Sequence, residues 1–367
     1  MALISVVLFL AVVAIVVGWK YGIERRPHRD ASPALEKAED AKAPPVPDMT
    51  IEPLEGFDWK ATEPVKIRPF KPVFHITMAL QSTAPSDLIV MDYNYKERVL
   101  GRRELIAEHT STVSGFIPMG VSAVEEAYSY LLTDYLPVRF PTMFTLSEDR
   151  KTFNNLVTEV SWPTTPPADT LEALKILGET VEDDIFLLHK TDRGHLAVAF
   201  VCCYSSGFDP SSKLGKILEE IHAPVPSYNK IGASMERFFS RLEVGKNVKR
   251  VNWSITPEAT LFNTAGNHVH EEDLEWIKQD DEIDMDKARM RMELQTLSRF
   301  PKTQAIMFSF KTLLYPVKDA VAEGLGPQLA DAIEGLPKGN APGMWTYKGG
   351  IRWGKSVLNY LRAQPQP

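Results

Sequence analysis

Two closely spaced prolines, Pro224 and Pro226, constrain the fold of the chain around them. Proline lacks a backbone N–H and disfavours helical geometry in the residue before it, so a helix that reaches this point must end. Upstream, apolar residues recur at helical spacing between Leu214 and Ile221, and Asp209 is a typical helix cap. The sequence therefore predicts an amphipathic helix that ends near His222, beside its own apolar face.

A second amphipathic helix is predicted after the prolines, over roughly residues 227–242. Its apolar positions are Ile231, Met235, Phe238, Phe239 and Leu242. The next segment, Arg250–Ile255, is predicted as a strand that runs past both helices.

The position of His222 allows two interpretations. A neutral imidazole anchored in this way can bind a metal or a haem iron. A histidine at a helix end can also cap carbonyls or face solvent, because cations are favoured at helix C-termini. Position and spacing leave both open.

Composition excludes several classes of protein. The 367-residue chain has a net charge of −7, which argues against an electrostatic nucleic-acid binder. Its two cysteines, Cys202 and Cys203, are adjacent, which disfavours a disulfide between them and indicates a reducing compartment. The sequence has no dinucleotide-binding glycine motif, Walker loop, HExxH, GxSxG or iron–sulfur cysteine cluster. A redox reaction would therefore need electrons from a separate partner.

The N-terminus has the pattern of a membrane anchor. Residues 2–18 are uncharged and apolar, and Trp19, Tyr21 and several basic residues follow. We predict a single-pass helix over residues 1–24, at the endoplasmic reticulum, with the rest of the chain cytosolic. A cleaved signal peptide is the alternative, but it lacks a charged start and a clear cleavage site. A flexible linker is predicted over 25–71, and a folded domain over 72–367.

The folded part has the pattern of the α+β class. Apolar runs at 185–189 and 195–203, separated by Thr-Asp-Arg-Gly, predict a hairpin, and further strands are expected at 250–255 and 304–314. Helical segments precede and separate these strands. The elements predict helices packed over an antiparallel sheet.

Several polar side chains have more than one interpretation. Glu293 and Gln295 alternate with apolar residues, so they are either paired in the core or face a cavity. Lys311, on the last strand, is expected to snorkel to solvent. His268 and His270 suit a metal if they lie on a strand, but their surroundings are loop-like and no third ligand is evident.

Four long segments resemble the haem-dependent oxidative N-demethylase family. They are KLGKILEEIHAPVPSY, RFFSRLEVGKNVKRVNW, the stretch Met292–Thr312 and the stretch Ala332–Gly349, the last of which resembles the fungal branch. The resemblance covers roughly residues 87–349. Tyr204-Ser205-Ser206 departs from the Phe-Pro-Ser that we expect in this family.

The resemblance implies a PAS-like antiparallel sheet with flanking helices that cradles haem b. It implies that His222 is the proximal iron ligand and that Glu293 binds a substrate cation. Arg139 and Arg250 are expected to pair with the haem propionates, although a structural ion pair is the default for Arg139. The implied reaction is oxidation of a methyl group on a small-molecule amine or a secondary metabolite, with electrons from a separate reductase. The alternative is a non-catalytic haem- or ligand-binding PAS-like sensor or scaffold, since fold does not imply function.

Overall fold

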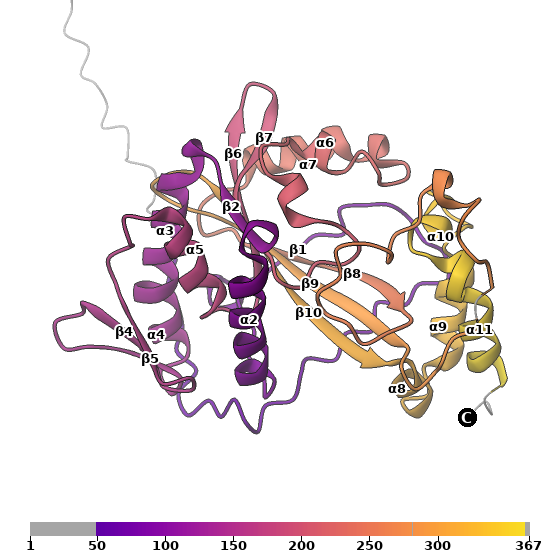
Figure 1. Cartoon of the computed structure of the whole chain (residues 1–367), viewed down its shortest axis with the longest axis horizontal. Coiled ribbons are helices and arrows are strands. Elements are labelled where there is room, and N and C mark those ends of the chain that lie inside the picture. The colour runs from indigo at the N-terminus through magenta and orange to yellow at the C-terminus, as the bar shows by residue number, and fades with distance from the viewer. Residues whose placement is uncertain (1–48, 281, 364–367) are drawn as a thin grey trace, which may run out of the picture. The chain divides into compact units, whose positions relative to one another are not determined.

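The computed structural model of the chain describes residues 49–280 and 282–363. Its centre is a seven-stranded antiparallel sheet with the strand order β1-β8-β9-β10-β6-β7-β2 (Figure 1). These strands are β1 (Gln81–Ser82), β2 (Ser114–Phe116), β6 (Asp184–Thr191), β7 (Gly194–Val201), β8 (Val248–Thr256), β9 (Arg289–Arg299) and β10 (Ile306–Pro316). A three-stranded antiparallel sheet contains β3 (Phe144–Leu146), β4 (Thr152–Asn155) and β5 (Val160–Pro163). The α+β class with antiparallel sheets is confirmed.

The helices lie in groups around the sheet. Those before β6 are α2 (Tyr95–Val113), α3 (Val121–Ser129), α4 (Leu136–Arg139) and α5 (Thr170–Gly178), with a π-helical segment at Tyr130–Tyr135 between α3 and α4. Between β7 and β8 lie α6 (Leu218–Ile221) and α7 (Gly232–Arg241). After β10 come α8 (Val317–Ala322), α9 (Gly326–Glu334), α10 (Met344–Tyr347) and α11 (Gly350–Ala363). Figure 1 shows the first and last groups at the two sides of the sheet.

The two faces of the sheet differ because successive strand residues point in opposite directions. On one face, Leu188 and Ile306 pack with Met235 and Phe239 of α7, and we call this the α7 face. The opposite face packs against α2, α3 and α5 at one end, and against α9 and α11 at the other.

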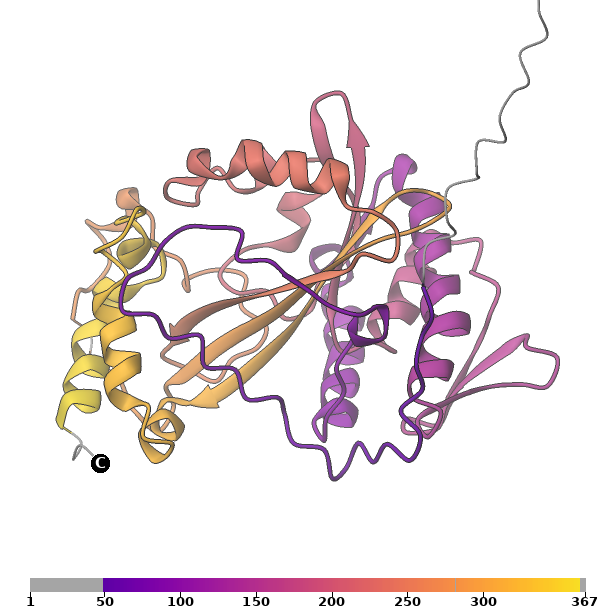
Figure 2. The same ribbon diagram turned by 180° about the vertical axis from the view of Figure 1, so that it is seen from behind.

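Residues 49–80 form an extended segment, the N-terminal strap, that runs along the domain (Figure 2). Leu54 packs with the cluster around α2 and α3, Phe70 with the cluster around α9 and α11, and Leu80 with the cluster around α7. Arg68 adds an ion pair, with its Nε 2.8 Å from Glu323 Oε2. The strap belongs to the same compact unit as the sheet, and the domain start at residue 72 stays a prediction. Residues 25–48 of the predicted linker lie outside the described residues.

The membrane prediction is corrected by the structure. Within residues 49–280 and 282–363, no helix combines the length and the apolar character needed to cross a membrane. The helix predicted over 1–24 lies outside the described residues. The α+β part of the predicted fold class is kept, and its transmembrane helix is withdrawn. The predicted single-pass location at the endoplasmic reticulum is withdrawn with it.

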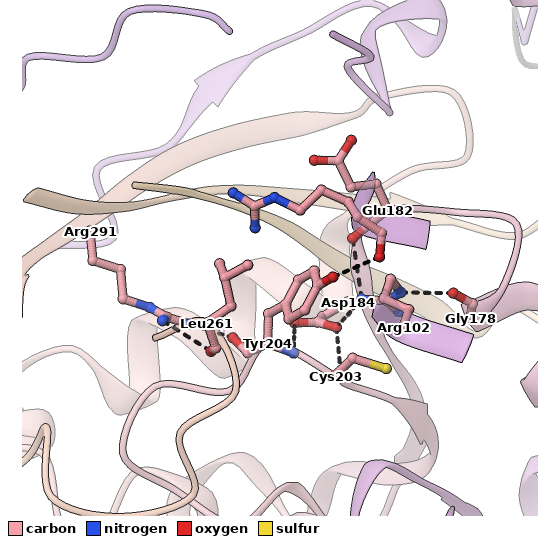
Figure 3. Close-up of polar contacts among 9 residues, drawn as sticks. Arg102, Gly178, Glu182, Asp184, Cys203, Tyr204, Leu261 and Arg291 are labelled. Atoms are coloured by element: carbon pink, nitrogen blue, oxygen red, sulfur yellow. Dashed lines mark hydrogen bonds and ion pairs between the residues drawn. The ribbon is translucent and has the colours of Figure 1, made fainter. Parts of the chain in front are cut away.

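A buried ion pair joins α2 to β6. Arg102 Nη1 lies 2.6 Å from Asp184 Oδ1, and both side chains are fully buried. Arg102 Nε donates to the Gly178 carbonyl at 2.7 Å, and the Asp184 carboxylate accepts from the backbone N–H groups of Cys203 and Tyr204 (Figure 3). The pair thus fixes α2 and the end of α5 to the strands of the hairpin.

Lys311 of β10 belongs to a second buried ionic group, on the face opposite α7. Its Nζ lies 2.7 Å from Asp92 Oδ2 and 2.9 Å from Glu182 Oε2, and it donates to the Val90 carbonyl at 2.9 Å. The expectation that Lys311 snorkels to solvent is therefore wrong. The ammonium reaches two carboxylates that the sequence places far from it.

Asp183, next to this group, is expected to make stability depend on pH. Burial raises the pKa of its carboxyl from the ordinary 3.8 to about 8, and Lys311 opposes this shift. The folded state keeps this proton at pH values where the unfolded chain has lost it, so stability falls as the pH rises from about 4 to about 8.

The substitution Asp183→Asn removes the titrating carboxyl and with it this pH-dependent loss of stability. We expect the variant to have a higher free energy of unfolding than the wild type at pH 8, and this difference to be smaller at pH 5. Urea denaturation measures both values. The same change at exposed Asp192 is the control, and an equal difference at both pH values would contradict the prediction.

Candidate functional site

The chain between β7 and α7 places His222 differently from the predicted continuous helix. Asp209 caps a 3₁₀ turn at Pro210–Lys213 by accepting from the Ser211 N–H. The chain then extends, because Gly215 adopts a φ of +73° and Ile217 pairs with Leu196 of β7. Only α6 remains helical before the prolines. The predicted end of the helix at His222 is confirmed, since His222 is the C-cap residue of α6.

The His222 side chain is oriented by two contacts. Its Nδ1 donates to the Leu218 carbonyl at 2.7 Å, and its ring stacks on Tyr228 with centroids 4.8 Å apart and planes at 4°. A carbonyl can only accept, so the hydrogen must lie on Nδ1 and the lone pair on Nε2. Burial lowers the pKa of this imidazole, and the charges of Arg250 and Lys213 lower it further. His222 thus offers Nε2, which has no hydrogen-bond partner among the described residues, as a neutral ligand.

Four polar side chains share one face of β8 and β9. Arg250 lies opposite Gln295, and Asn252 lies opposite Glu293, so all four point to the same side. We call them the β8–β9 polar row. Glu293 Oε2 accepts from Asn252 Nδ2 at 3.3 Å and from Gln295 Nε2 at 3.0 Å. Both hydrogen bonds fall on Oε2, and Oε1 makes none within the part of the chain that the structure describes.

Arg250 is coupled electrostatically to both His222 and this carboxylate. Burial lowers the pKa of its guanidinium, the charge of Glu293 opposes this shift, and the charge of Arg250 in turn affects His222. Its Nε is buried and makes no hydrogen bond in the described residues. Nor does any described carboxylate lie within salt-bridge distance of Arg250. Such a cation is suited to an anionic ligand.

An aromatic cluster continues the β8–β9 polar row across the sheet. Phe310 of β10 lies opposite Gln295 and so faces the same side. Its ring centroid is 6.4 Å from that of Phe186, which stacks on Phe200 at 5.5 Å. The cluster contains Phe186, Phe200, Cys202 and Phe310, with Phe208, Leu214 and Phe308 packed against it. A flat apolar group beside Arg250 would meet aromatic rings here.

Residues at the C-terminal end of α10 and in the segment before β9 flank the polar row. His268 stacks on Tyr347, with ring centroids 4.3 Å apart, and the Val269 N–H donates to the Tyr347 carbonyl at 3.2 Å. Burial and then the charge of Lys348 lower the pKa of His268 to about 3, so this imidazole is neutral at physiological pH. Lys348 donates to Asn252 Oδ1 at 3.1 Å.

The structure brings together three of the four residues predicted for the site. His222, Arg250 and Glu293 are linked electrostatically on the α7 face. Arg139 is elsewhere, at the end of α4, where its Nη2 lies 3.0 Å from Asp87 Oδ1 and its Nη1 donates to the Glu52 carbonyl. It forms the structural pair that was its default interpretation, and we do not carry it further as a propionate partner.

Sequence reasoning missed Lys348, Tyr347 and most of the aromatic cluster. The alternating phenylalanines of Ile306–Phe310 could have indicated the cluster, because they share one face of a strand. No local pattern marks Lys348. His268 and His270 both contact Tyr347, and within the described residues no three His, Cys, Asp or Glu side chains are arranged to hold a metal ion.

Within the described residues, the α7 face thus combines an imidazole nitrogen without a hydrogen-bond partner, a half-buried guanidinium without a carboxylate partner, and a cluster of aromatic rings. These features of the α+β domain suit an anionic aromatic ligand. Comparison with known families agrees with this inference. Residues 79–358, well over half of the chain, match the family described as haem-dependent oxidative N-demethylase, alpha subunit-like. The chain belongs to this family.

Proposed function

We propose that the domain is a haem-dependent oxidoreductase that removes a methyl group from an amine. The balanced reaction consumes the methylamine, dioxygen, two electrons and two protons, and it releases the demethylated amine, formaldehyde and water. The observation that supports it most directly is the arrangement of His222. Its Nδ1–H is committed to Leu218, its Nε2 has no hydrogen-bond partner among the described residues, and it is coupled electrostatically to Arg250, which is coupled in turn to Glu293.

The residues on the α7 face fit haem b. His222 would bind the iron through Nε2, since a proximal histidine commonly donates its other ring nitrogen to a carbonyl. Arg250, whose Nε has no hydrogen-bond partner among the described residues, would pair with a propionate, and the aromatic cluster would contact the apolar ring. When bound, haem supplies the activation of dioxygen.

Glu293 would bind the substrate as an alkylammonium ion. Two amide donors occupy Oε2 and fix the plane of the carboxylate, which leaves Oε1 to accept from a cationic amine. A small amine or the amine group of a larger secondary metabolite would be recognised in the same way.

Electrons would come from a separate reductase, because the sequence carries no dinucleotide or iron–sulfur motif. The matching family is described as alpha subunit-like, which supports a partner that completes the electron supply.

The test uses the full chain, reconstituted with haem and supplied with a reductant, and a panel of N-methylated amines. We expect a Soret band that shifts on amine addition, and formaldehyde released in a 1:1 ratio with the demethylated amine. Bound haem without any response to amines would favour the non-catalytic sensor instead. Absence of haem binding would overturn both.

Replacement of Glu293 by glutamine is expected to raise the KM for the amine by roughly 10- to 100-fold, the value of one charge-assisted hydrogen bond. Haem content is expected to stay unchanged, because Glu293 is not placed against the iron ligand. Steady-state formaldehyde release gives the KM. The exposed Glu97→Gln is the matched control, and equal KM values in the two variants would remove Glu293 from substrate binding.

A further inference from the structure

Lys348 is a buried lysine without a carboxylate partner in the described chain. Its side chain is 5% exposed, and its Nζ donates to the Trp253 carbonyl and to Asn252 Oδ1. Its Nζ also lies 5.8 Å from the Phe74 ring centroid and 5.7 Å from that of Trp253. Burying a charge in this way costs several kcal/mol unless another charge or dipole compensates.

The ammonium determines which way the Asn252 amide points. An ammonium has only donors, so the oxygen Oδ1 must face Lys348 and the Nδ2 group must face Glu293. A chain of polar contacts therefore runs from Lys348 through Asn252 to Glu293 Oε2, which Gln295 also contacts. As a result, Oε2 accepts two hydrogen bonds, whereas Oε1 accepts none from the residues that the structure describes.

The Glu293 carboxylate also acts on the charge of Lys348. Burial lowers the pKa of Lys348 to about 8, the carboxylate of Glu293 opposes this shift, and the charge of Arg250 adds to it. A neutral donor could equally satisfy the Trp253 carbonyl at the edge of β8. The positive charge therefore needs another explanation, and the Glu293 carboxylate is the anion that stabilises it electrostatically.

We propose that Lys348 is a positioning residue for Glu293, which orients Asn252 and so presents Glu293 Oε1 to a cationic amine. The role of Glu293 toward an amine rests on the proposed function, whereas the orientation of its carboxylate does not.

The groups facing Lys348 come from three elements. They are Arg250 on β8, Glu293 on β9, and His268 in the segment before β9, whose pKa Lys348 lowers. His268 remains neutral in the working range, and Arg250 remains charged. Deprotonation of Lys348 is therefore the change expected as the pH rises through about 8. Above this pH, the KM for the amine is expected to rise in the wild type.

The experiment compares Lys348→Met, Lys348→Arg and the exposed control Lys338→Met in the haem-loaded full chain. We expect Lys348→Met to raise the KM roughly tenfold, the size of one net hydrogen bond, with kcat and haem content nearly unchanged. The rise of KM above pH 8 should disappear in Lys348→Met, and Lys348→Arg should restore a low KM. Asn252→Ala should reproduce the KM effect while Lys348 is retained. A kcat loss without a KM change, or an unaltered pH profile in Lys348→Met, would overturn the proposal.

A second readout does not require turnover. The infrared carboxylate band of Glu293, identified as the difference between wild type and Glu293→Gln, should shift in both Lys348→Met and Asn252→Ala. No shift in either variant would overturn the positioning role. A shift in a protein that oxidises no amine would leave the positioning role intact and reject the proposed function alone.

Discussion

Replacement of His222 by alanine is expected to abolish stoichiometric haem binding. The His222 imidazole donates its Nδ1–H to the Leu218 carbonyl, and its Nε2 has no hydrogen-bond partner among the described residues. Loss of a partner that merely orients a ligand typically weakens metal binding 10- to 100-fold, so loss of the ligand itself should cost more than about 100-fold in haem affinity. A pyridine haemochrome assay and the Soret absorbance measure the effect.

Two controls separate ligand loss from misfolding. The exposed His75→Ala should keep a full complement of haem, and the His222→Ala protein should retain the circular dichroism of the wild type. If His222→Ala instead bound haem stoichiometrically with an unchanged spectrum, the iron ligand would lie elsewhere in the chain.

Replacement of Arg102 by methionine is expected to destabilise the fold by about 3–5 kcal/mol, because it leaves a buried carboxylate without its partner. Asp184 is 1% exposed, and the 2.6 Å contact with Arg102 is its ion pair (Figure 3). The two backbone N–H donors at Cys203 and Tyr204 would remain but cannot neutralise the charge. Urea denaturation with an unchanged m-value would report the loss.

The surface offers a matched control for this substitution. Arg362 of α11 lies 2.6 Å from Asp331 Oδ1 in an ion pair whose side chains are 39% and 51% exposed. Exposed pairs contribute less than about 1 kcal/mol, so Arg362→Met should cost little. Comparable losses in the two variants would mean that burial does not decide the strength of the Arg102 pair.

The local sequence pattern was sufficient to predict the positions of the strands that carry the site. Arg250–Ile255 and the hairpin from Ile185 could be predicted because alternation and turn residues are encoded within a few positions. The end of the helix at His222 followed from proline geometry, which acts on the adjacent residue. The family resemblance supplied the cofactor expectation, and the family is confirmed over residues 79–358.

Tertiary contacts decided what the sequence could not. The helical spacing before His222 was overridden by Gly215 at positive φ and by the pairing of Ile217 with Leu196. Arg139 and Lys311 were assigned environments from their neighbours in sequence, but their partners come from distant segments. Lys348 was missed for the same reason, since Asn252 lies 96 positions before it.

The N-terminal strap has a practical consequence for where this protein can be divided. The family match begins at residue 79, but Phe70 and Phe74 cover apolar side chains next to α9 and α11. The Phe74 N–H also donates to the Gly335 carbonyl at 3.1 Å. A fragment that begins at residue 79 would expose these apolar side chains to water. We therefore expect a stable fragment to need the strap as well as the region that matches the family.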